Sequence, residues 1–241
     1  MKGSMGFGWA MLLLLAAASA SHIAAQEEVQ PEISNENRLY QQALVEAERG
    51  STLERRGKKA AAVDAYEFAG RLAEASITEA ERSGAAQEGR PPQVYFLCAT
   101  SYLHAGRVLS SIKRVDDRWD EMLRKAELYL GEVEKIEAER AQRTNTPLNP
   151  EIWRVRNAAG YVSFLRGQLA KARLHYTAVL ELNPTYKPAQ QALAEINKLE
   201  QRENELFTPQ GKTLDTENRR KALKEVVSTL RLVRDIVTLG R

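Results

Sequence analysis

The sequence has very little cysteine and histidine. Its 241 residues contain one cysteine, Cys98, and three histidines, which are His22, His104 and His175. A single cysteine cannot close a disulfide within the chain, and the scattered histidines form no HExxH motif or Cys/His cluster of the kind that binds zinc. Cys98 falls in an apolar stretch, so we interpret it as a small core residue. We therefore predict no internal disulfide, no metal site and no cofactor.

Aromatic residues are also scarce, and neither sign of charge is in large excess. Aromatic residues make up 7% of the chain, and the net charge is only +3. Such a small positive charge gives no reason to expect a nucleic-acid partner, which would require a concentrated basic face. Charged residues reach 28%, with many Ala, Glu, Leu and Arg, which is typical of a helical protein. We therefore expect an all-α fold.

Long hydrophobic runs are absent after the first 25 residues. Lys2 precedes an apolar run that ends at Ala18, and small residues continue to Ala25. This order is typical of a secretory signal peptide, so we predict that residues 1–25 direct export and that cleavage follows Ala20 or Ala25. The mature protein would then be periplasmic or secreted, with no transmembrane segment. An uncleaved N-terminal anchor is the alternative, although the run is short for a span of about 20 residues.

Glycines recur at a fixed interval in the rest of the chain. Gly160 and Gly167 lie seven residues apart, and Ala172 and Tyr176 follow Gly167 at five and nine residues. A glycine inside a helix lets a second helix approach closely, and a glycine at a helix end favours a turn. The interval predicts two packed helices joined at the second glycine, with Ala172 against Gly160. The same offsets occur earlier in the chain, at Gly50, Gly57, Ala62 and Tyr66.

With Pro184 ending the second helix, the segment 153–186 resembles a tetratricopeptide repeat (TPR), a helix–turn–helix unit of 34 residues. It departs from the family pattern at Arg156, where a Trp is usual, and at Ser163, where a Tyr is usual. The resemblance implies a right-handed stack of antiparallel helical hairpins, a TPR-like α-solenoid, with extra C-terminal helices. It also implies a non-catalytic scaffold that binds a protein or peptide partner.

The limits of the elements follow from apolar periodicity and from helix-breaking residues. We predict a flexible leader at 26–34, a repeat domain at 35–202, a linker at 203–215 and a C-terminal helix at 216–241. Within the repeat domain we predict helices at about 35–56, 58–83, 93–105, 118–143 and 187–202, beside the two of the repeat at 153–186.

The middle copy of the repeat is irregular. Ala99 is assigned to the position of the glycine inside the first helix (the packing glycine, Gly160 in the third copy), and Gly106 to that of the glycine at the turn (Gly167 in the third copy). The next helix does not follow at once. Periodicity leaves open whether residues 107–117 are helical. The acidic pair Asp116 and Asp117 in this stretch is typical of a turn or a helix cap and has no partner for general acid–base catalysis. No other catalytic constellation is found, so we expect no enzyme activity.

In the repeat family, one side of each first helix lines a concave groove, so the resemblance implies candidate binding residues. They are Phe96, Thr100, Leu103 and His104 in the middle copy and Arg154, Asn157, Tyr161 and Phe164 in the third, with Leu44, Ala47, Ser51 and Glu54 at these places in the first. Few of them are cationic, which favours an apolar groove for an amphipathic helix or an extended segment over a clamp for a carboxylate. The alternative is that the aromatic members pack inside the protein.

The C-terminal segment carries a stripe of aliphatic residues at spacings of three and four. They are Leu223, Val226, Leu230, Val233 and Val237. Such a stripe is typical of a helix that packs back on the array, binds a partner, fills the groove or forms a coiled coil with a second copy. A homo-oligomer built through this helix, without a peptide ligand, is therefore the alternative function.

Overall fold

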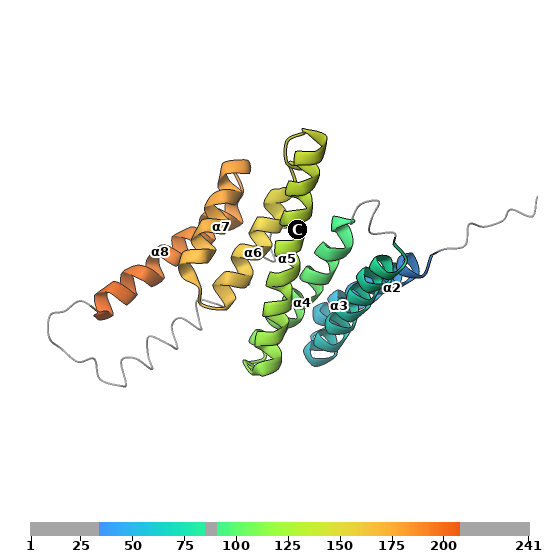
Figure 1. Ribbon diagram of the computed structural model, residues 1–241. Helices are drawn as coiled ribbons and strands as arrows, with labels where there is room; N and C mark the ends of the chain where they lie inside the picture. Colours follow the sequence, from blue (N-terminus) through green and yellow to red (C-terminus); the bar gives the residue numbers. More distant parts are fainter. Residues whose placement is uncertain (1–33, 85–90, 208–241) are drawn as a thin grey trace, which may run out of the picture. The chain divides into compact units, whose positions relative to one another are not determined.

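The computed structural model describes residues 34–84 and 91–207, with residues 202–207 as backbone alone. This part of the chain forms seven α-helices and no strand (Figure 1). The helices are α2 (Asn35–Arg55), α3 (Lys59–Arg82), α4 (Pro92–Ser111), α5 (Asp117–Thr144), α6 (Ile152–Leu165), α7 (Leu169–Leu182) and α8 (Lys187–Phe207). The predicted all-α class is confirmed for these residues. The predicted signal peptide and the predicted C-terminal helix lie outside them.

Consecutive helices pair into hairpins. In the first, Ser76 Oγ near the end of α3 donates to the carbonyl of Glu36 at the start of α2, at 2.8 Å. Near the turn, Tyr66 OH donates to Glu54 Oε2 at 3.2 Å. The first contact joins the start of α2 to the later part of α3, and the second joins the end of α2 to the earlier part of α3. The two helices are therefore antiparallel. Helix α4 packs against α5, and α6 against α7 (Figure 1).

The turns of the first and third hairpins have the same structure. Gly57 and Gly167 have φ angles of 74° and 73°, in the left-handed region that favours glycine. In both turns the glycine N–H donates to the carbonyl three residues back, and the next N–H donates to the carbonyl five residues back. This is the Schellman arrangement, which satisfies the last carbonyl groups of a helix. The predicted role of both glycines at the turn is confirmed.

Glycine also allows the close approach of the two helices in these hairpins. A Cβ at Gly160 would lie 3.0 Å from the ring of Tyr176, and a Cβ at Gly50 would lie 2.7 Å from the ring of Tyr66. The ring of Tyr176, rather than Ala172, therefore makes the closest contact with Gly160. Ala172 is itself fully buried in the same core. The prediction that Ala172 makes this contact was wrong, because the face of the Tyr176 ring lies against Gly160 instead.

The middle hairpin has a different register from the predicted one. Helix α4 continues past Gly106 to Ser111, and a Cβ at Gly106 would lie 2.6 Å from Leu123 of α5. The turn comes at Lys113, which has a φ of 60° and the same pair of hydrogen bonds as the turn glycines. Gly106 is thus the packing glycine, and Lys113 occupies the turn position seven residues later. Seven residues are about two helical turns, so the apolar pattern is nearly unchanged by this shift.

The remaining limits agree with the sequence except at the end of α8. Helices α2, α3 and α5 begin and end within one residue of their predicted limits. The open stretch 107–117 is helical as far as Ser111, and Asp116 then caps α5 by accepting a hydrogen bond from the N–H of Trp119 at 3.1 Å. Helix α8 runs to Phe207 rather than 202, because no helix-breaking residue occurs before Pro209.

Candidate interaction surface

The eight predicted groove residues divide between the core and the surface. Leu103, Tyr161 and Phe164 belong to the hydrophobic core and are 6%, 3% and 1% exposed. This corrects the prediction that they face a partner, because core residues of one chain pack against one another. Arg154 is exposed, and the partly exposed members are Phe96, Thr100, His104 and Asn157.

The corrected register of the middle hairpin identifies an inner residue that the sequence analysis missed. Arg107 follows its packing glycine by one residue, as Ser51 and Tyr161 follow theirs. Its side chain is 8% exposed, and its Nη2 donates to Glu54 Oε2 of α2 at 2.5 Å. The interval of seven residues between Gly106 and Lys113 could have identified this register in the sequence. It was not recognised because the residue at the turn is a lysine rather than a glycine.

Two aromatic rings complete this buried ion pair. Tyr66 OH donates to the same oxygen of Glu54 at 3.2 Å, and the ring of His104 stacks on that of Tyr66 with 5.1 Å between centroids. Burial and the negative charge of Glu54 raise the pKa of Tyr66 to about 12, so the phenol keeps its proton at neutral pH. The position that would line a groove between α2 and α4 is therefore filled by contacts within the chain.

What remains open lies on α4 and α6, which contact each other. Thr100 and Arg154 both precede their packing glycine by six residues, so they occupy equivalent positions on the two helices. We name this surface the α4–α6 face and define it by its partly or fully exposed members, which are Phe96, Leu97, Thr100, His104, Arg154 and Asn157.

The α4–α6 face has two apolar members, Phe96 and Leu97, beside four polar ones, and several of the polar groups make contacts within the chain. The hydroxyl of Thr100 donates to the carbonyl of Phe96 at 2.8 Å, so its hydrogen-bonding capacity is partly used within α4. The Oδ1 atom of Asn157 is buried and accepts no hydrogen bond. Arg154 lies over the ring of Trp153, 5.4 Å from its centroid, and pairs with Glu151 at 2.5 Å.

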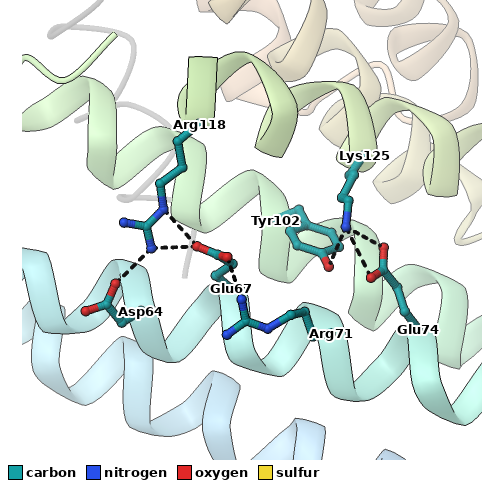
Figure 2. A network of polar contacts seen from close by, with 7 residues as sticks. All are labelled: Asp64, Glu67, Arg71, Glu74, Tyr102, Arg118 and Lys125. Carbon is teal, nitrogen blue, oxygen red and sulfur yellow. Dashed lines mark hydrogen bonds and ion pairs between the residues drawn. The ribbon is translucent and has the colours of Figure 1, made fainter. Parts of the chain in front are cut away.

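A second polar cluster joins α3 to α5 (Figure 2). Arg118 of α5 donates to Asp64 at 2.8 Å and to Glu67 at 2.5 Å, and Lys125 of α5 lies 3.1 Å from Glu74. The acidic residue that comes later in α3 pairs with the basic residue that comes later in α5, so α3 and α5 run parallel. This is the arrangement expected of second helices in adjacent hairpins.

The groups in this cluster are held by one another rather than poised for reaction. Lys125 Nζ also lies 3.3 Å from Tyr102 OH, and Glu74 accepts a hydrogen bond from Tyr129 OH at 3.1 Å. Burial raises the pKa of both phenols and of the nearby Cys98 thiol, which keeps all three protonated at neutral pH. The cluster therefore acts as a brace between two hairpins and offers no activated nucleophile.

Within residues 34–84 and 91–207, no group of three or more His, Cys, Asp or Glu side chains is placed to hold a metal ion. No helix in that part of the chain is long and apolar enough to cross a membrane. No family model, no curated protein and no solved structure matches this chain.

Proposed function

We propose that this protein is a non-catalytic scaffold of an exported, TPR-like type that binds a segment of a partner protein on the α4–α6 face. The observation that supports it is a packing glycine followed seven residues later by a left-handed turn residue. This pair recurs at Gly50 and Gly57, Gly106 and Lys113, and Gly160 and Gly167. Recurrence of one hairpin design is typical of a repeat array, and on that basis we infer a right-handed stack of hairpins.

The partner segment is best matched by an amphipathic helix or an extended strand with apolar side chains. Helix α4 carries one charged side chain, Arg107, and that group is paired with Glu54. A charged partner face would find no counter-ion along α4 and would lose hydration. Phe96 and Leu97 instead offer partly exposed apolar surface packed on a firm core.

Export is part of the proposal and rests on the predicted signal peptide at residues 1–25. The place of action is then the periplasm or the outside of the cell. The alternative function is a structural oligomer assembled through residues 216–241, which the aliphatic stripe from Leu223 to Val237 favours. Sedimentation of the purified protein separates the two, since an oligomer sediments as a multiple of the chain mass without a partner.

The experiment that tests the scaffold is cross-linked capture from the native compartment with matched variants. Thr100→Arg places a bulky charge on the α4–α6 face, whereas Leu174→Arg places the same charge on α7, where Leu174 is 72% exposed. A partner that is captured by the wild type and by Leu174→Arg, but at least tenfold less by Thr100→Arg, supports the proposal. Equal capture by both variants would show that the α4–α6 face is not the binding surface.

A further inference from the structure

The turns of the first two hairpins lie side by side. Glu54, next to the last residue of α2, pairs with Arg107, which lies in the last turns of α4. Arg118, at the start of α5, pairs with Asp64, in the first part of α3 (Figure 2). Helices α2 and α4 therefore end close together, and α3 and α5 begin close together. The two connecting turns form one edge of the molecule.

This edge carries a concentration of positive charge. We name it the turn edge and define it by its six basic residues, which are Arg55, Arg56, Lys58, Lys59, Lys113 and Arg114. All of them are exposed except Lys59, which is partly exposed. Their six charges exceed the net charge of +3 of the whole chain, so the rest of the chain is net negative.

The charge of the turn edge is largely uncompensated within the described part of the chain. None of its six basic side chains forms an ion pair with a residue in 34–84 or 91–201. Glu54 and Asp64, the acidic residues next to the first turn, are engaged by basic residues of α4 and α5. Asp116 and Asp117 at the second turn offset two of the six charges, and Asp116 is also the cap of α5. An excess of exposed positive charge remains.

The third hairpin turn shows the opposite arrangement. Arg166 and Lys171, the basic residues next to that turn, both pair with Glu127 of α5. Their charges are thus neutralised by contacts that join two hairpins. The basic residues of the turn edge make no such contact, so bracing of the stack does not account for them.

An exposed aliphatic side chain lies beside the basic groups. Val115 directly follows Arg114 at the second turn and is 64% exposed. Basic side chains around an aliphatic tip suit the surface of an anionic bilayer, where cations meet headgroup phosphates and the apolar group reaches the acyl boundary. A peptide would instead require a groove or a sheet edge, whereas the turn edge consists of the tips of two hairpins.

We propose that the turn edge binds the phosphate headgroups of an anionic membrane surface. Each Lys or Arg near such a surface adds to the affinity, and the attraction falls off within about 8 Å at physiological salt. Several residues of the turn edge must therefore act together, and salt should weaken the attachment. This interaction goes beyond the scaffold function and uses a different surface from the α4–α6 face.

Co-sedimentation of the mature chain with lipid vesicles tests the proposal. One set of vesicles contains phosphatidylglycerol and phosphatidylcholine in equal parts, and the other contains phosphatidylcholine alone. The edge variant combines Arg56→Gln, Lys58→Gln and Arg114→Gln. The control variant removes the same charge at exposed positions of α5 and α8 and combines Lys135→Gln, Arg143→Gln and Lys187→Gln. Because all six positions are exposed, neither variant disturbs the core.

The wild type and the control variant should bind the anionic vesicles, and the edge variant should bind at least about tenfold more weakly. None should bind phosphatidylcholine alone, and about 0.5 M salt should release the wild type. Equal binding by both variants, no binding by the wild type, or equal binding to both sets of vesicles would overturn the proposal. Release by inorganic phosphate or by an acidic peptide, at an ionic strength where sodium chloride has no effect, would also overturn it. The ligand would then be a free anion or an acidic protein segment.

Discussion

Arg107 of α4 and Glu54 of α2 form a short ion pair, 2.5 Å between Nη2 and Oε2, that joins the first two hairpins. Arg107→Leu should lower the free energy of unfolding by about 3 kcal/mol, because it leaves a half-buried carboxylate without its cation. Urea denaturation measures the loss. Arg49→Leu, which breaks the more exposed pair with Glu46, is the control and should cost less than about 1 kcal/mol. Equal losses would show that the Arg107 pair is not specially buried.

Lys113 is strained at the turn between α4 and α5, where its φ is 60°. Lys113→Gly should raise the free energy of unfolding by about 1 kcal/mol, because glycine adopts this conformation without a Cβ clash. Asn145, with a φ of 48° at the end of α5, tolerates the same conformation better, so Asn145→Gly should gain less. Denaturant midpoints compare the two. A loss of stability for Lys113→Gly would contradict the corrected register of the middle hairpin.

Gly50 and Gly131 are both helical glycines, but they have different surroundings. Gly50→Ala should lower the free energy of unfolding by about 1–3 kcal/mol, because its Cβ would lie 2.7 Å from the rigid ring of Tyr66. A Cβ at Gly131 meets nothing within 4 Å, so Gly131→Ala should gain up to about 1 kcal/mol from helix propensity. Thermal unfolding of both variants checks the sign. Stabilisation by both would mean that Gly50 is not a packing glycine.

We expect Glu127 to account for part of the loss of folding stability at acid pH. Burial alone would raise its pKa, but Lys171 and Arg166 outweigh burial and hold the pKa below its usual value. A carboxyl group with a depressed folded pKa contributes stability above its unfolded pKa of about 4.3 and loses it as the pH falls through the folded value. Glu127→Gln should therefore flatten the fall in unfolding free energy below about pH 4.3. Unfolding curves of wild type and variant with the same slope would refute this role.

The predicted signal peptide defines a mature N-terminus. Protein isolated from its native host should begin at Ser21 or Gln26, because small residues at Ala20 and Ala25 precede the two candidate cleavage sites. N-terminal sequencing identifies which site is used. A chain recovered from the cytosol that still begins at Met1 would contradict export and, with it, the proposed place of action.

The turn glycines were readable from the sequence, whereas the ring that contacts each packing glycine was not, because the pattern predicted Ala172 rather than Tyr176 against Gly160. Glycine at positions 57 and 167 suits the left-handed residue that ends a helix, and the interval of seven places a second glycine inside the preceding helix. These are local constraints of backbone conformation and helical period, so they are encoded within about 20 residues. The all-α class and most helix limits follow from the same local information.

Only the tertiary structure decided the register of the middle hairpin and the composition of the candidate surface. A shift of seven residues leaves a helical pattern almost unchanged, so the sequence allowed Gly106 at the turn as readily as inside α4. Burial of Tyr161 and Phe164, and the pairing of Arg107 with Glu54, depend on neighbours more than 50 residues away or on another helix. Such contacts arise from how the hairpins stack, and no local pattern in the sequence records them.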